Sequence, residues 1–212
     1  LSLHDALPIL ERIYNWFKEM GAFLSLEARA ELKKLNEKLL ELKNTMDNAI
    51  MKASQKGFYA TKEELIGIPE SFLETLTKNE QGKYFINATY PTNENIMNYC
   101  INREIRKKQY NLFCDRGLAN KELSQQYTET QNKIAKIFEY KNVAEYYMFV
   151  SGKRMAQSIE EIEHFLEEIN EKTKKKALEE IEIIKKFALK HLHYKEIFPW
   201  DTSFILLERL YP

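Results

Sequence analysis

The most regular feature of the chain is an apolar stripe between Leu32 and Ala53. Hydrophobic side chains recur there every three or four residues, and mostly Lys, Glu and Asn fill the other positions. This spacing is typical of one face of an amphipathic α-helix. The stripe comprises Leu32, Leu35, Leu39, Leu42, Met46, Ala49 and Ala53. Ser25 is a suitable N-cap and Gly57 a suitable end, so we predict a long helix between them.

A second stripe follows Ser158. Glu161 stands three residues after this serine, in the register of a capping box, and apolar residues continue at helical spacing. They are Ile159, Ile162, Phe165, Leu166, Ile169, Ala177, Ile181, Ile184 and Ala188. Pro199 cannot lie in a helix interior, so the helix ends before it. The pattern predicts a helix of about 35 residues, roughly 50 Å long.

The segments between these helices are shorter. A break at Gly67 to Pro69 predicts a turn, with a short helix beginning at Glu70. Residues 82–91 predict an extended segment, although no partner strand of comparable strength is evident. Such a segment makes any sheet minor.

Two more helices are expected, one from Thr92 to Gly117 and one over about residues 121–139. The inner face of the first is marked by Met97, Ile101, Ile105 and Leu112. Together these patterns predict a mainly α fold, a multi-helix array with long helices and at most a minor extended segment.

The composition narrows the function classes. Lys and Arg together number 32, as do Asp and Glu, so the net charge is zero, and we expect no nucleic-acid partner. No run approaches the roughly 18 apolar residues of a membrane span, so we expect no membrane partner. On one helix Cys100 and Cys114 would lie roughly 21 Å apart, too far for a disulfide. We therefore predict two buried thiols in a reducing, cytoplasmic compartment.

The residues of the chain form no recognisable catalytic constellation. The sequence contains no His-Glu-x-x-His, no Gly-x-Ser-x-Gly and no glycine-rich phosphate loop. His164 is predicted to be a solvated helix residue. His191 and His193 would point to different faces of a helix, and Glu196 alone does not complete a zinc site. We assign no catalytic, cofactor-binding or metal residue. The aromatic residues predicted to pack in the core or an interface are Tyr146, Tyr147, Phe149, Phe198, Trp200 and Phe204.

Several short motifs follow one another in a fixed order from Leu10 onward. They are "LERIYNWFKEMGAFLS", "LIGIPE", "NYCINREIRKKQY", "DRG", "KRMAQSIEEIEHFL" with Met155, and "PWD". The third contains the pattern Tyr-x-x-Asn-Arg-Glu-x-Arg, formed by Tyr99, Asn102, Arg103, Glu104 and Arg106. In this order the motifs resemble the N-terminal portion of the thimet oligopeptidase family of zinc metallopeptidases, in its oligopeptidase A and peptidyl-dipeptidase group.

The resemblance implies that residues 10–212 form the helical N-terminal part of a peptidase that hydrolyses short peptides. They would supply one wall of its substrate channel. The family's zinc is held by the two histidines of a His-Glu-x-x-His helix and a later Glu, and these would lie downstream in a separate catalytic domain. The full-length parent would then bind zinc, whereas the present chain would bind none and be inactive. Both the endo-acting and the peptidyl-dipeptidase subgroups fit.

Arg103 and Arg106 are better explained as structural residues than as substrate ligands. Two cations three apart on a helix are suited to pairing with carboxylates on neighbouring helices. Residues 1–9, "LSLHDALPI", show nothing of the family and resemble a translated sequencing adapter. We expect them to be an artefactual leader.

A rival hypothesis is a stand-alone helical or coiled-coil interaction module without enzymatic activity. It rests on the stripe from Leu32 to Ala53 and on the helix after Ser158. Such a module should be complete and have polar outer faces. A channel wall should instead expose apolar surface where the catalytic domain packs.

Overall fold

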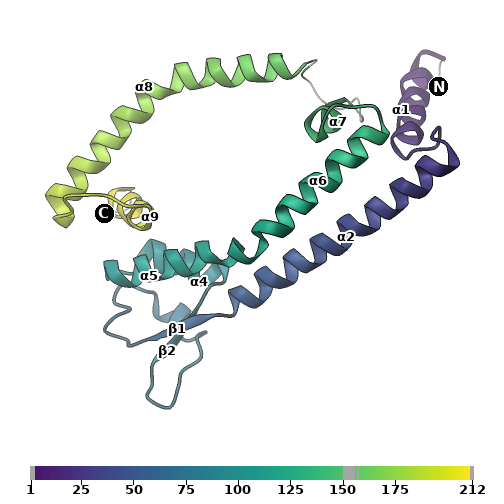
Figure 1. The fold of residues 1–212 in the computed structure, drawn as a ribbon. Coiled ribbons are helices and arrows are strands. Elements are labelled where there is room, and N and C mark those ends of the chain that lie inside the picture. Colours follow the sequence, from purple (N-terminus) through teal and green to yellow (C-terminus); the bar gives the residue numbers. More distant parts are fainter. Residues whose placement is uncertain (1–2, 150–155, 157, 211–212) are drawn as a thin grey trace. The chain divides into compact units, whose positions relative to one another are not determined.

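A computed structural model describes residues 3–149, 156 and 158–210, and it is mainly α-helical (Figure 1). The helices are α1 (Leu3–Glu19), α2 (Leu26–Ser54), α3 (Glu70–Leu73), α4 (Tyr90–Tyr99), α5 (Arg103–Cys114), α6 (Lys121–Ile137), α7 (Val143–Phe149), α8 (Ile159–Leu192) and α9 (Thr202–Leu210). The 3-10 helices are η1 (Asp115–Asn120) and η2 (Pro199–Asp201), and the strands are β1 (Gly57–Ala60) and β2 (Tyr84–Asn87). The predicted mainly α fold is confirmed. Met155 of the family-like motifs lies outside the described residues.

The chain divides into two compact units, each formed by two separate stretches of sequence. The first unit contains residues 1–46 and 121–171, and the second contains residues 47–120 and 172–212. α1, α6 and α7 therefore belong to the first unit, whereas the two strands and α3, α4, α5 and α9 belong to the second. α2 and α8 each contribute residues to both.

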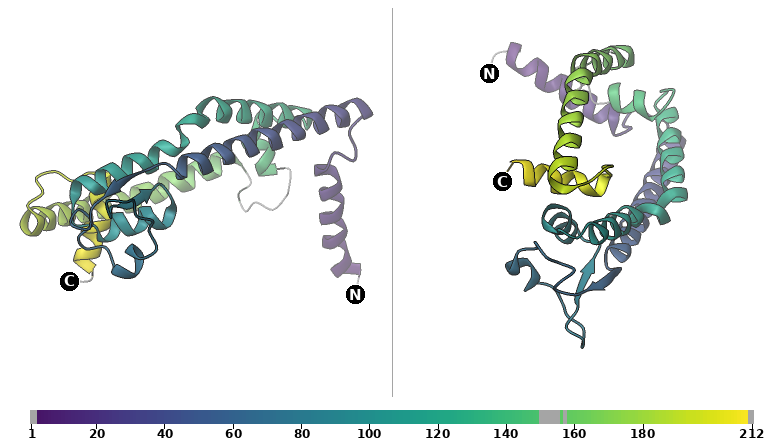
Figure 2. Two further views of the ribbon diagram at one scale, coloured as in Figure 1. Left: turned by 90° about the horizontal axis from the view of Figure 1, so that it is seen from below. Right: turned by 90° about the vertical axis from the view of Figure 1, so that its left-hand side faces the viewer.

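α2 follows the predicted pattern closely. The Oγ of Ser25 accepts a hydrogen bond of 3.1 Å from the N–H of Ala28, as expected of an N-cap. Every residue of the predicted stripe is buried or half-buried, and the residues between its members are exposed. In the first unit α6 runs alongside α2, and the Oγ of Ser124 lies 3.7 Å from the sulfur of Met46 (Figure 1, Figure 2).

α1 begins at Leu3 and continues to Glu19 without a break. No change of secondary structure therefore marks the junction at Leu10 where the expected leader ends. Residues 1–2 lie outside the described residues. The origin of residues 1–9 stays a prediction.

The predicted extended segment is β2, and it does have a partner. β1 pairs with it antiparallel, with Gly57 opposite Asn87 and Ala60 opposite Tyr84. Sequence reasoning treated Gly57 only as the end of the preceding helix. Along β2 the side chains alternate, and Tyr84 and Ile86 are buried in the core of the second unit.

The single helix predicted from Thr92 to Gly117 is wrong. Two helices, α4 and α5, replace it, because the backbone becomes extended at Cys100 and Asn102. The side chain of Asn102 then accepts hydrogen bonds from two backbone N–H groups and starts a new helix. As a result Ile101, expected on the inner face, is 55% exposed. Thr92 lies inside α4, where its hydroxyl donates to Asn87 Oδ1 at 2.8 Å.

Gly67 holds the turn that precedes α3, whose predicted start at Glu70 is confirmed. Its φ is +97°, and the adjacent carbonyl of Ile66 accepts a hydrogen bond of 2.9 Å from the N–H of Ile101. A Cβ at Gly67 would run into the carbonyl oxygen of Tyr99. Only glycine fits here, because other residues rarely adopt a positive φ and because a Cβ would clash with Tyr99.

We therefore expect Gly67→Ala to destabilise the second unit by at least about 2 kcal/mol, because backbone strain adds to the clash. Urea unfolding followed by circular dichroism measures this. Gly82→Ala is the matched control, since its φ is +74° but nothing lies within 4 Å of its Cβ position. Equal stabilities of the two variants would show that the contact with Tyr99 contributes nothing.

α8 starts where the sequence predicts, with the N–H of Glu161 donating to the Oγ of Ser158 at 3.1 Å. Its apolar stripe, however, is largely uncovered. Ile162, Phe165 and Leu166 are 36%, 57% and 57% exposed, and Ala188 is the one fully buried residue among the described residues of the helix. Neither α8 nor any other helix in the described part of the chain is long and apolar enough to cross a bilayer.

Candidate functional site

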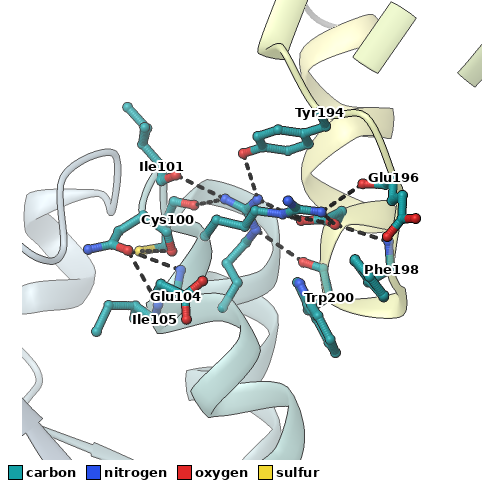
Figure 3. A network of polar contacts seen from close by, with 12 residues as sticks. Cys100, Ile101, Glu104, Ile105, Tyr194, Glu196, Phe198 and Trp200 are labelled. Carbon is teal, nitrogen blue, oxygen red and sulfur yellow. Dashed lines mark hydrogen bonds and ion pairs between the residues drawn. The ribbon is translucent and has the colours of Figure 1, made fainter. Parts of the chain in front are cut away.

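α5 begins with two arginines that face a segment from the end of the chain. The cap at Asn102 makes Arg103 the first residue of the helix. Arg106 follows three residues later, so the two side chains lie on the same side of α5. Both contact Asp201 in η2, which follows them by 98 and 95 residues respectively. Figure 3 shows the resulting network within the second unit.

Asp201 is the centre of the network. Its Oδ1 accepts hydrogen bonds from Nε of Arg103 at 2.9 Å and from Nη2 of Arg106 at 3.0 Å. Its Oδ2 accepts from Nη2 of Arg103 at 2.6 Å and from the N–H of Phe198 at 3.0 Å. The Asp201 side chain is 0% exposed, so this carboxylate depends entirely on protein donors.

Two opposing effects act on the pKa of Asp201. Burial raises it, because the charged carboxylate loses its water. Hydrogen bonds from Arg103, from the N–H of Phe198 and from Arg106 lower it. The hydrogen bonds outweigh burial, so the pKa lies below its ordinary value. The group stays ionised near neutral pH and is a poor candidate for a general acid or base.

Arg106 is fully buried, and each of its N–H groups has an acceptor. Nε donates to the carbonyl of Trp200 at 3.1 Å, and Nη1 donates to the carbonyls of Cys100 at 2.7 Å and Ile101 at 3.1 Å. Nη2 donates to the hydroxyl of Tyr194 at 3.0 Å and to Asp201. The guanidinium carbon also lies 4.2 Å from the centre of the Phe204 ring. This arginine therefore has no donor left for a ligand.

Arg103 is different, because its side chain is 29% exposed. Nε and Nη2 face Asp201, and Nη2 also donates to the carbonyl of Glu196 at 2.8 Å. The guanidinium carbon lies 4.3 Å from the centre of the Tyr194 ring and 5.5 Å from that of Phe198. Hydrogen bonding to Asp201 raises the pKa of Arg103 above its ordinary value, so it is permanently charged.

Arg103, Arg106 and Asp201 together hold two elements of the second unit in contact, and we call these three residues the clamp. Two permanent cations and one ionised carboxylate transfer no protons, but they tie α5 to η2 through charge-assisted hydrogen bonds. The prediction that Arg103 and Arg106 pair with a carboxylate is confirmed, with the partner on the short 3-10 helix η2 and not on an α-helix. Sequence reasoning assigned no role to Asp201 or Tyr194. The one available signal was the Asp of "PWD" within the same series of motifs as the two arginines.

The described side chains of His164, His191 and His193 do not form a metal site. His164 is exposed, as predicted, and the ring of His191 stacks on Phe187 at 4.6 Å. His193 follows α8 with a φ of +59°, and this turn brings Tyr194 back toward the helix, where its N–H donates to the carbonyl of Ala188. Within residues 3–149, 156 and 158–210 no group of three His, Cys, Asp or Glu could hold a metal ion. These donors do not fit a catalytic zinc.

A comparison with protein families identifies the chain. Residues 96–208, which include all three charged residues of the clamp, match the family model described as "Peptidase family M3". The chain belongs to Peptidase family M3. The resemblance expected from the sequence motifs is therefore confirmed.

Two curated relatives support this membership. The family M3 chain is 23% identical over 210 residues to oligopeptidase A of Haemophilus influenzae, which covers 92% of the chain and 30% of the relative. It is 25% identical over 204 residues to a probable cytosolic oligopeptidase A of Arabidopsis thaliana, covering 87% of the chain and 28% of the relative. The chain thus spans less than a third of the length of either relative.

The aromatic residues of this family M3 chain mostly pack as predicted. Phe204 is buried beneath Arg106, and Trp200 is half-buried, with Phe198 stacked on it at 4.8 Å between ring centres. Phe198 is 38% exposed, and the centre of its ring lies 5.5 Å from the guanidinium carbon of Arg103. In the first unit Tyr146 is half-buried and Tyr147 is exposed. The side chain of Phe149 lies outside the described residues.

The prediction of two buried thiols is half wrong. Cys100 is buried in the core of the second unit, whereas Cys114, at the far end of α5, is exposed. Burial raises the pKa of the Cys100 thiol, and this outweighs the lowering by a backbone hydrogen bond and by the charge of Arg106.

We therefore expect one thiol of the folded chain to react with DTNB and the other to be protected. Cys114→Ser should remove the fast phase, because Cys100 is inaccessible and protonated. Cys100→Ala should leave that phase intact. Two equally fast thiols before denaturant is added would contradict the burial of Cys100.

Proposed function

We propose that this chain forms a non-catalytic helical wall of a larger, zinc-dependent family M3 peptidase that cleaves short peptides. Family membership supports a peptidase, and the names of the two relatives support oligopeptides as substrates. The name of the Arabidopsis relative also supports a cytosolic location. The donors of the described residues do not suit zinc, so the metal and the hydrolysis would belong to another part of the peptidase.

The observation that carries this proposal is the uncovered face of α8. Ile162, Phe165 and Leu166 lie on one side of the helix and present their side chains to solvent. Apolar side chains grouped in this way usually mark a surface that packs against another protein part. A further part of the peptidase, bearing the catalytic residues, is the occupant that the family suggests.

The same exposure recurs on α1. Leu10, Ile13 and Phe17 are 60%, 43% and 48% exposed, and they also stand three or four residues apart. Both helices thus present apolar stripes, in contrast with α2, whose stripe is covered. A complete, stand-alone helical module would be expected to have polar outer faces.

A peptidase assay tests the proposal. The 212-residue chain is incubated with a quenched-fluorescent peptide, with and without ZnCl₂, and zinc binding is measured by equilibrium dialysis. We expect no saturable hydrolysis and no stoichiometric zinc. Saturable, zinc-dependent cleavage by this chain alone would refute a non-catalytic role.

The rival, a self-sufficient coiled-coil module, is tested through α8. Phe165→Glu and Leu166→Glu should reduce binding of the dye ANS and concentration-dependent aggregation, while helicity and melting temperature change little. Glu167→Gln on the exposed polar side of the same helix is the control. A defined oligomer with reversible melting, destroyed by the same two substitutions, would favour the interaction module instead.

A further inference from the structure

We propose that the exposed edge of Arg103 binds the carboxylate group of a small ligand. This edge borders an open pocket of about 420 Å³ within the second unit. The pocket is lined by Arg103, His193, Tyr194, Lys195, Glu196 and Phe198. The inference concerns binding by this chain itself and does not depend on the peptidase proposal.

The first argument is the charge of the clamp. Arg103 and Arg106 carry two positive charges, whereas Asp201 supplies a single negative charge and is completely buried with Arg106. The charges of the buried pair Arg106 and Asp201 cancel, so the excess positive charge of the network lies on Arg103. Because Arg103 is its one partly exposed member, an anion can reach the excess charge only there.

The second argument is the arrangement of donors on Arg103. Its Nε and Nη2 are committed to Asp201 and to the carbonyl of Glu196. Among the described residues Nη1 has no acceptor, so its two N–H groups are available at the outer edge of the guanidinium. The rings of Tyr194 and Phe198 lie against this guanidinium and restrict its movement. The donor is thus held in place before any ligand binds.

The third argument is the second cation of the pocket. Lys195 follows Tyr194 directly and is exposed, and no described carboxylate lies within ion-pair distance of its ammonium. Glu196 lines the same pocket and Glu104 lies on the first turn of α5, so two carboxylates oppose an anion. Both are exposed, so water and salt screen their charge more than that of the less exposed Arg103.

A carboxylate fits these features better than a phosphate. Arg103, Lys195 and Glu196 together carry one net positive charge, which a monoanion balances, whereas a phosphate dianion would leave the pocket negative. A carboxylate can also share its two oxygens between a guanidinium and an ammonium. Tyr194 and Phe198 add apolar surface for whatever carries the acid group.

The test uses sodium hippurate, a carboxylate with an aromatic ring, and hippuramide as its neutral analogue. Binding to the 212-residue chain is followed by NMR, through the Nε–H of Arg103 and the backbone amides of residues 193–198. We expect saturable binding of hippurate that weakens as salt increases, with hippuramide binding at least about tenfold more weakly. Inorganic phosphate is titrated separately.

Lys195→Gln carries the mutational test, because Arg103→Gln would disturb Asp201 as well as the pocket. We expect this variant to raise the Kd for hippurate about tenfold, the loss of one charge-assisted contact. Lys190 is an exposed lysine of α8 that does not line this pocket, so Lys190→Gln should leave the Kd unchanged. Equal binding of hippuramide, tighter binding of phosphate, or an unchanged Kd in Lys195→Gln would each overturn the assignment.

Discussion

Arg106→Ala is expected to destabilise the second unit by about 3 to 5 kcal/mol. Arg106 is completely buried, and all of its donors are satisfied by protein acceptors. Truncation leaves the carbonyls of Cys100 and Ile101 and the hydroxyl of Tyr194 without this donor, and it opens a cavity above the Phe204 ring. Asp201 keeps Arg103 but loses its only fully buried cation.

The stability of the second unit can be measured separately, because each unit contains one tryptophan. Trp200 belongs to the second unit and Trp16 to the first, so Trp16→Phe gives a background in which fluorescence reports on Trp200. Urea unfolding in that background should show a lower midpoint for Arg106→Ala. Lys190→Ala removes an exposed charge from α8 and should change stability by less than about 0.5 kcal/mol. Similar midpoints for Arg106→Ala and Lys190→Ala would mean that the clamp contributes little.

Asp201→Asn should remove about 3 to 5 kcal/mol at pH 7, because it leaves Arg103 and Arg106 without a counter-charge in a buried site. The pH dependence provides a sharper test. The pKa of Asp201 is lowered in the folded chain, so its contribution is fully present above the ordinary value, about 3.9. That contribution is lost as the pH falls through the lower folded-state pKa.

The difference in unfolding free energy between the parent chain and Asp201→Asn should therefore be constant from about pH 5 to 7 and shrink below about pH 4. Urea titrations over this range measure it. Asp115→Asn is the control, since the side chain of Asp115 is exposed; its difference should be small at every pH. A parent-minus-variant difference that grows toward acid would contradict a lowered pKa for Asp201.

The long helices could be predicted because their information is local. The stripe of α2 and the caps at Ser25 and Ser158 are set by residues within one or two turns of each other. The same reasoning could not predict that the helix is interrupted before α5. Apolar spacing continues across Cys100, and the competing signal is a single side chain, Asn102, which caps a new helix.

The residue that pairs with Arg103 and Arg106 could not be predicted from the sequence pattern. The spacing of Arg103 and Arg106 predicts that they share a carboxylate partner, but many acidic residues could have supplied it. β1 was missed for a similar reason, because four residues beginning with glycine become a strand only through pairing with β2. The exposed stripe of α8 looked like a core face because amphipathicity shows that a face is apolar, without showing what covers it.

The distance in sequence between Arg106 and Asp201 also determines how early the clamp can form during protein synthesis. Asp201 is added to the growing chain 95 residues after Arg106. At about 5 to 20 residues per second, the ribosome needs roughly 5 to 20 s to make this stretch. During that interval Arg106 lacks Asp201, its partner in the folded chain. The incomplete clamp is then open to chaperones and proteases, and a stall before the codon for Asp201 would prolong this exposure.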